Sequence, residues 1–168
     1  MLVFLKLGGS LITDKTKPYT ARLDIIERVA KEIKEVLEES RDIKILVGHG
    51  GGSFPHVSAK NYETHKGFIR EDSKYGFCMV QNDASKLNRI VVETFLKLGL
   101  KAISLQPSAG ALAENDKITR WDIQNIEILL REGIMPVVYG DVCLDTKKGC
   151  CIISTEEIFK YLAEKLKP

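Results

Sequence analysis

Apolar and polar residues alternate along this chain in two recurring patterns. Short, mostly apolar runs predict strands buried on both faces of a sheet; they are residues 2–7, 43–47, 101–105 and 135–139. Longer amphipathic or helix-like segments lie between and after them, in residues 24–39, 75–98, 121–131 and 156–167. Gly99 and Gly133 are placed to end two of these helices. The chain is therefore predicted to alternate strands with helices.

This alternation changes after residue 141. Residues 142–144 and 150–153 flank Asp145-Thr146-Lys147-Lys148-Gly149, which predicts a β-hairpin with a longer loop. Strands that alternate with helices favour a mostly parallel sheet with right-handed crossovers and helices on both faces. We therefore expect an α/β fold: a three-layer αβα sandwich with a mostly parallel central sheet, plus a β-hairpin. The charged residues 63–74 are expected to form a loop.

Length and composition restrict the number of domains, the kinds of partner and the location that can be expected. The 168 residues suffice for one domain, predicted to span 1–168, and 44% of them are hydrophobic. A net charge of +2 gives no general attraction to nucleic acid or to a membrane. No apolar run reaches the length of a membrane helix and no signal peptide is recognised, so a cytoplasmic location is the default expectation. The four cysteines lack zinc-ligand spacing, and we expect no metal held by protein ligands.

Two glycine-rich turns carry most of the chemical information. Lys6-Leu7-Gly8-Gly9-Ser10 closes the first predicted strand, and Gly48-His49-Gly50-Gly51-Gly52-Ser53 closes the second. Glycine lets backbone N–H groups approach a ligand such as phosphate. Ligands of parallel sheets gather beyond the carboxyl ends of the strands, where the segments 106–110 and 140–141 also lie. Alternatively, Gly8-Gly9 is only a tight turn.

Several polar residues lie near these turns. Lys6 ends an otherwise apolar strand, where it either stabilises a phosphoryl group or is a solvated strand-end lysine. Lys15 lies near the first turn, where it either contributes to the same chemistry or is an ordinary surface lysine. His56 follows the second turn near the start of a short helix, which suits a phosphate monoester. Asp141 could orient a lysine or a metal, or cap the hairpin, whereas His49 could simply pack.

These motifs together resemble the amino-acid kinase superfamily and, within it, the archaeal-type isopentenyl phosphate kinases. The resemblance runs along essentially the whole chain in the same order. Besides the two turns, its motifs are Thr13-Asp14-Lys15, Phe54-Pro55-His56, Leu87-Asn88-Arg89-Ile90-Val91, Pro107-Ser108 and Pro136-Val137-Val138-Tyr139-Gly140-Asp141-Val142.

The resemblance implies transfer of the γ-phosphate of ATP to isopentenyl phosphate, in an alternative mevalonate route to isoprenoids. It implies that His56 holds the substrate phosphate, that Lys6 bridges the phosphates, and that Lys15 steadies the transferring group. Mg²⁺ would enter with the nucleotide. The implied contacts to ATP are Lys6, Leu7, Gly8, Gly9, Ser10 and Gly52, and those to the substrate are Gly51, His56 and Gly140; Asp141 is carried over as a catalytic residue. For the apolar tail we expect a pocket formed by Tyr75, Phe77, Cys78, Met79 and Val80; the alternative is that these residues only pack in the core.

The chain departs from the family pattern in three places. It stops where the nucleotide-binding half of the family would begin, so we expect this lobe alone, as a homodimer or paired with a missing C-terminal half. Pro55 replaces a glycine before His56, and Ser154-Thr155-Glu156-Glu157 replaces Ser-Gly-Asp. The alternatives are a non-catalytic module that binds a small phosphomonoester, or a kinase for another small phosphate or phosphonate.

Overall fold

A parallel four-stranded sheet forms the centre of the computed structural model, which describes residues 1–40 and 42–168. Its strands follow the order β1-β2-β6-β3 and all neighbours are parallel. The strands are β1 (Leu2–Leu7), β2 (Lys44–His49), β3 (Ala102–Ser104) and β6 (Met135–Tyr139). All four lie where the apolar runs predict them, because a strand covered on both faces is apolar along its length.

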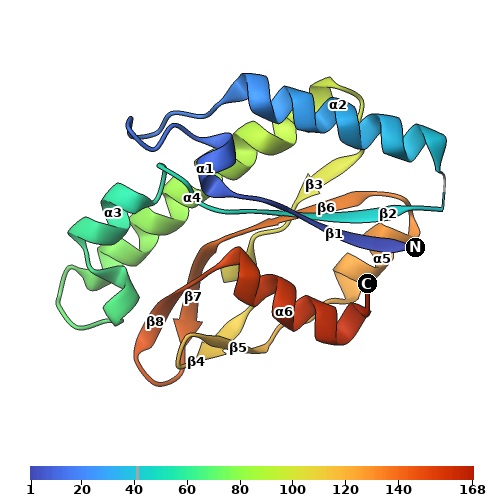
Figure 1. The fold of residues 1–168 in the computed structure, drawn as a ribbon. Helices are drawn as coiled ribbons and strands as arrows, with labels where there is room; N and C mark the ends of the chain where they lie inside the picture. The colour runs from blue at the N-terminus through green and yellow to red at the C-terminus, as the bar shows by residue number, and fades with distance from the viewer. Residues whose placement is uncertain (41) are drawn as a thin grey trace.

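Helices cover both faces of this sheet, as predicted (Figure 1). On one face lie α2 (Leu23–Glu39) and α4 (Ser73–Lys97), and on the other lie α5 (Gln124–Arg131) and α6 (Thr155–Leu166). Neighbouring residues of β2 serve the two sides: Val47 packs in the core with α2 and α4, whereas Leu46 packs in the core with α5 and α6. The central sheet is thus the shared wall of two hydrophobic cores.

A second four-stranded sheet, in the order β5-β4-β7-β8, lies beside the α5–α6 core. The predicted hairpin forms two of its strands, β7 (Asp141–Asp145) and β8 (Gly149–Ile153), which pair antiparallel. The other two, β4 (Leu112–Glu114) and β5 (Lys117–Arg120), are absent from the prediction. They are short and largely polar, so their periodicity is weak. Their only local signal is Asn115-Asp116, which turns the chain with φ of 49° and 66°.

Short elements complete the fold, namely α1 (Gly9–Ile12), α3 (His56–Asn61), and the 3₁₀ turns η1 (Thr64–Lys66) and η2 (Pro107–Ala109). The expected loop at 63–74 therefore contains η1 and the first residues of α4. α5 begins at Gln124 rather than at 121, since the Asp122 carboxylate accepts the Gln124 N–H at 3.0 Å in a local turn. Among the described residues, no helix is both long and apolar enough to cross a membrane.

Candidate active site

The two glycine turns pack directly against each other, backbone to backbone. A Cβ placed on Gly9 would lie 2.5 Å from the Gly52 nitrogen, and one placed on Gly50 would lie 2.9 Å from the Gly9 nitrogen. Gly52 also has φ +55°, a conformation that glycine adopts readily. Three of these glycines are therefore required by contact between the turns. Gly8 differs, because a Cβ there would meet nothing within 4 Å.

Thr13 connects the two turns from beneath. Its buried hydroxyl donates to the Gly9 carbonyl at 2.7 Å and accepts the Ser53 N–H at 3.0 Å. Both partners are backbone groups, so the hydroxyl fixes the path of one turn relative to the other. Thr13 belongs to one of the motifs described above, but the sequence predicts no role for it. The contact to Ser53 spans 40 residues, so no local pattern reveals it.

A cavity of about 660 Å³ opens over these turns. It collects residues from β1, both turns, α3, β7, β8 and the start of α6. Ten of the predicted site residues line it: Lys6, Gly8, Gly9, Ser10, Lys15, Gly51, Gly52, His56, Gly140 and Asp141. Leu7 does not line it, because its side chain is buried in the core and its carbonyl accepts the Gly50 N–H at 3.0 Å.

Lys6 has a carboxylate partner that the sequence analysis missed. Its Nζ lies 2.7 Å from Glu156 Oε1, at the N-terminal turn of α6, and both side chains are partly exposed. The hydrogen bond from Lys6 holds the pKa of Glu156 below its usual value. Glu156 also lines the cavity. It stands in the segment that departs from the family pattern, which is the signal that could have drawn attention to it.

Asp141 is buried between the two sheets. One of its carboxylate oxygens accepts the Ser108 N–H at 3.1 Å and the other accepts the Val142 N–H at 2.9 Å. Burial raises its pKa to about 6, and these hydrogen bonds oppose the rise. Asp141 therefore ties η2 to the start of β7, and it is one of the residues that line the cavity.

His49 packs within the core beside the cavity, as the sequence analysis allowed. Burial lowers its pKa to about 4, so the ring is neutral at pH 7. Nδ1 lies 3.0 Å from the Gly50 carbonyl oxygen and Nε2 lies 3.1 Å from Asn88 Nδ2. In a neutral ring these partners require Nδ1–H to donate and Nε2 to accept. The ring also stacks on Tyr139, and it thereby supports the second turn from the core side.

The cavity wall beyond the turns contains six further residues, and of these the sequence analysis singled out Val80 alone. Ala59, Val80, Ile152 and Ile153 provide apolar surface, and Lys60 and His65 provide polar groups. Of the five residues expected to form an apolar pocket, Val80 alone is among the described residues that line this cavity. His65, to which the sequence gave no role, lies on η1 at the cavity.

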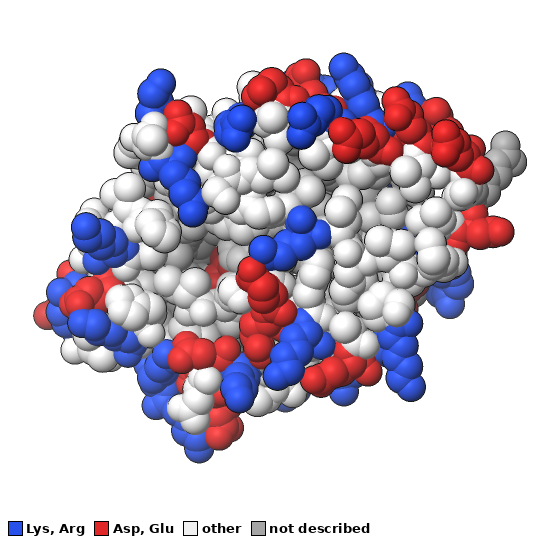
Figure 2. Space-filling model, viewed as in Figure 1, with Lys and Arg blue, Asp and Glu red and all other residues white. Residues whose placement is uncertain are grey.

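Charge is mixed on the face of the molecule that Figure 2 shows. Figure 2 shows basic and acidic side chains interspersed over the face viewed as in Figure 1, rather than gathered by sign. A mixed surface agrees with a net charge of +2. Positive charge at the cavity therefore comes from individual lysines rather than from a broad basic patch.

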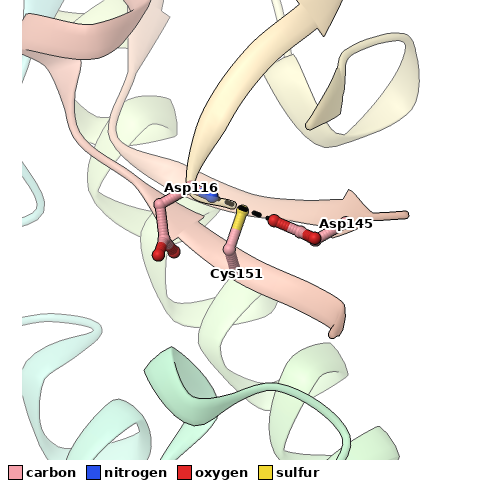
Figure 3. A group of neighbouring side chains, drawn as sticks. All are labelled: Asp116, Asp145 and Cys151. Carbon is pink, nitrogen blue, oxygen red and sulfur yellow. Dashed lines mark hydrogen bonds between the residues drawn. The ribbon is translucent and has the colours of Figure 1, made fainter. Parts of the chain in front are cut away.

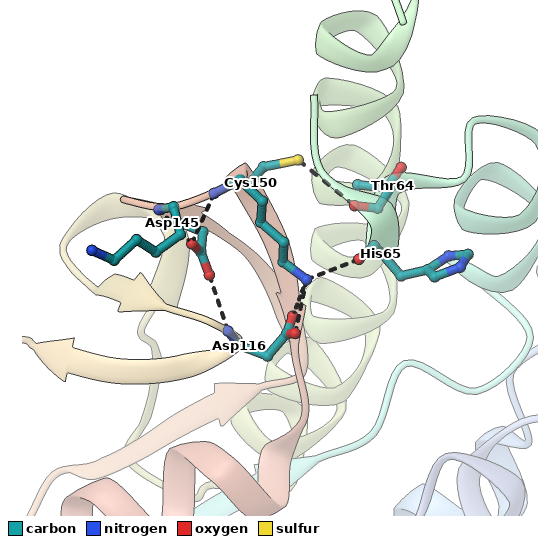
Figure 4. A network of polar contacts seen from close by, with 7 residues as sticks. Thr64, His65, Asp116, Asp145 and Cys150 are labelled. Carbon is teal, nitrogen blue, oxygen red and sulfur yellow. Dashed lines mark hydrogen bonds and ion pairs between the residues drawn. The ribbon is translucent and has the colours of Figure 1, made fainter. Parts of the chain in front are cut away.

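A second group of polar residues lies away from the turns, at the hairpin tip. Asp116, Asp145 and Cys151 lie close together (Figure 3), with ligand atoms within 4.8 Å of one another. Asp145 already accepts the N–H groups of Asp116 and Lys147 at 3.0 and 2.9 Å. Lys148 Nζ lies 2.6 Å from Asp116 (Figure 4). The ammonium group of Lys148 thus already offsets the negative charge of this cluster. We assign the cluster a structural role, which is to hold together the turns of the chain at the hairpin tip.

Comparison with known proteins agrees with this geometry. The model of the amino acid kinase family matches residues 1–168. Isopentenyl phosphate kinases of Methanocaldococcus jannaschii and Methanothermobacter thermautotrophicus are 38% and 37% identical over 99% of this chain. The chain spans 66% and 64% of their lengths. A crystal structure of isopentenyl phosphate kinase superposes with a TM-score of 0.92 at 35% identity, covering 100% of this chain and 69% of that one.

Proposed function

Because the chain belongs to the amino acid kinase family, we propose that it takes part in phosphorylating isopentenyl phosphate with ATP to give isopentenyl diphosphate. One observation carries the proposal. Lys6, Lys15 and His56 meet two glycine turns around a single cavity, in a chain 38% identical to an isopentenyl phosphate kinase over 99% of its length. The pathway implied is isoprenoid synthesis by an alternative mevalonate route, in the cytoplasm.

The proposed roles follow from the demands of phosphoryl transfer, which are positioning and positive charge rather than covalent chemistry. His56, at the start of α3, holds the acceptor phosphate, with Gly51 and Gly140 beside it. Gly8, Gly9, Ser10 and Gly52 present backbone to the ATP phosphates. Lys6 and Lys15 neutralise charge on the group in transit. Leu7 supports the first turn from the core.

Glu156 orients Lys6 in this proposal. A carboxylate 2.7 Å from Nζ restricts a side chain that otherwise has several rotamers available. Neither side chain is buried, so the ion pair orients Lys6 more than it stabilises the fold.

The apolar part of the cavity suits the tail of the acceptor. Ala59, Val80 and Ile152 line the same cavity as His56. A phosphate held at His56 would leave its hydrocarbon chain against these side chains, where burial of apolar surface is favourable.

Magnesium fits this site through the nucleotide rather than through the protein. Among the described residues that line the cavity, the carboxylates are Asp141 and Glu156. Asp141 accepts backbone N–H groups with both oxygens, and Glu156 is paired with Lys6. Mg²⁺ is commonly held by substrate phosphates and water, and when bound it would offset phosphate charge. We therefore propose no protein metal site.

The test is formation of isopentenyl diphosphate from ATP, Mg²⁺ and isopentenyl phosphate, followed by phosphorus NMR. We expect Lys6→Ala to lower kcat about a hundredfold, since a lysine at the developing charge acts in the transition state. We expect His56→Ala to raise the KM for isopentenyl phosphate at least tenfold. Lys31→Ala, at an exposed lysine of α2, is the matched control and should leave both constants unchanged.

Near-normal turnover by both Lys6→Ala and His56→Ala would overturn these roles. Binding of isopentenyl phosphate without any ATP-dependent product would instead support a phosphomonoester-binding module. Faster turnover of another small phosphate or phosphonate would show that this compound is the acceptor, with the same type of reaction.

A further inference from the structure

Lys15 lies on an excursion of the chain between α1 and α2. Thr13 and Ala21 form an isolated antiparallel bridge at its base, and the Asp14 N–H donates to the Thr20 carbonyl at 2.9 Å. The Asp14 carboxylate turns the chain by accepting the Thr16 N–H at 2.9 Å. These contacts shape the loop locally, but they do not fix it to the rest of the molecule.

Tyr19 makes that connection to α4. Its hydroxyl donates to Asp83 Oδ2 at 2.8 Å, across 64 residues of sequence. Asp83 is 1% exposed on α4, and its other oxygen accepts from Lys86 Nζ at 3.1 Å. The Lys86 ammonium also lies 5.7 Å from the centre of the Tyr19 ring. A hydrogen bond to a buried carboxylate is stronger than one between neutral groups, so this contact can hold a loop in place.

Tyr19 also contacts the second glycine turn. Its ring meets the ring of buried Phe54 edge to face, with centroids 5.8 Å apart. Next to it, the Thr20 N–H donates to Ser53 Oγ at 3.4 Å. Tyr19 adopts this position with φ 52°, a backbone conformation that is uncommon for a bulky residue. Such a conformation persists where surrounding contacts determine it.

We propose that Tyr19 is a positioning residue that latches the Lys15 loop to Asp83 of α4 and to the second glycine turn, and so sets the place of Lys15 at the cavity. This inference rests on the proposed function, in which Lys15 steadies the transferring group. The acceptor phosphate is held by His56 on a different element. Loss of the latch should therefore reduce kcat and leave the KM for the acceptor nearly unchanged.

The test uses the full chain and Tyr19→Phe, which keeps the ring and removes the hydroxyl. We expect trypsin to cleave the Lys15–Thr16 bond about tenfold faster, since the loop opens more often. We expect kcat to fall about tenfold, as misplacement of a catalytic group does, with the KM for isopentenyl phosphate within about twofold. Tyr161→Phe is the matched control, because its hydroxyl also donates a hydrogen bond, to the Trp121 carbonyl at 3.1 Å. It should change neither readout.

A double variant separates positioning from a general loss of stability. In a Lys15→Ala background, Tyr19→Phe should lower kcat no further, because the hydroxyl acts through Lys15. An equal fall of kcat in both backgrounds would overturn the proposal, as would unchanged cleavage by trypsin. If the unaltered chain forms no isopentenyl diphosphate, the proposed function fails. The cleavage rate then still decides the latch: faster cleavage of Tyr19→Phe supports it, and equal cleavage rejects it.

Discussion

His49 and Asp141 are two buried titratable side chains whose pKa values shift in opposite directions. Burial lowers the pKa of His49 from 6.5 to about 4 and raises that of Asp141 from 3.8 to about 6. The folded protein binds fewer protons at His49 than the unfolded chain does, and more at Asp141, over nearly the same pH range. His49 therefore adds stability as pH rises from about 4 to 6.5, and Asp141 removes it.

The pH dependence of stability tests this opposition. In Asp141→Asn only the His49 effect remains, so its free energy of unfolding should rise relative to wild type by about 3 kcal/mol between pH 4 and 7, at about 1.4 kcal/mol per pKa unit. His49→Gln should show the reverse trend. Urea unfolding at a series of pH values and constant salt measures both. If the free energy of unfolding varied with pH in the same way for wild type and both variants, neither pKa would be shifted by folding.

At the scale of elements, the two glycine turns form a single unit, and the structural reason for a glycine differs from one position to the next. Gly9, Gly50 and Gly52 leave room for the facing turn, and Gly52 also has a positive φ. Gly8 faces open space with φ −61°, so the fold itself would accept a side chain there. What excludes a side chain at Gly8, in the proposed function, is the ligand.

Alanine substitutions separate these two reasons. Gly8→Ala should change the free energy of unfolding by less than about 0.5 kcal/mol yet lower turnover, because its methyl group enters the cavity. Gly52→Ala should lower the free energy of unfolding by about 1–3 kcal/mol from backbone strain alone, and by more because the added methyl group would overlap the Thr13 hydroxyl. Urea unfolding and turnover of both variants provide the comparison. A Gly8→Ala protein less stable than Gly52→Ala would contradict the assignment.

At the scale of the whole molecule, the cavity lies where the two sheets meet. A single residue, Gly140, separates β6 of the first sheet from β7 of the second. The far end of the second sheet is tied to η1 by Lys148, whose Nζ donates to the His65 carbonyl at 3.0 Å and to Asp116 at 2.6 Å (Figure 4). The second sheet thereby fixes the segment that carries His65 to the cavity wall.

Removing this tie should affect acceptor binding more than chemistry. Lys148→Met keeps the hydrocarbon stem and removes the ammonium group, so we expect a several-fold higher KM for isopentenyl phosphate, an unchanged kcat, and faster amide hydrogen exchange in residues 64–68. Lys147→Met is the control, because Lys147 Nζ pairs with partly exposed Glu114 at 3.4 Å. Equal effects of the two substitutions would rule out a specific role for Lys148.

The sequence alone determined the central sheet, its main helices and the hairpin. Each of these depends on local periodicity, as in β2 and α2, where burial repeats with the period of the element. The sequence also predicted that the two glycine turns, with Lys6, Lys15 and His56 near them, lie together, because parallel strands end at one edge of the sheet and bring their following turns together. Ten of the predicted site residues consequently line one cavity.

Only the tertiary structure decided the remaining features. β4 and β5 are too short and polar to be recognised from periodicity. The partners Thr13–Ser53, Lys6–Glu156 and Tyr19–Asp83 lie 40, 150 and 64 residues apart, so no local pattern encodes their contact. The shifts at His49 and Asp141 arise from burial, which depends on every element packed around them. Composition and spacing specify which elements form, whereas the packing of those elements specifies which side chains meet.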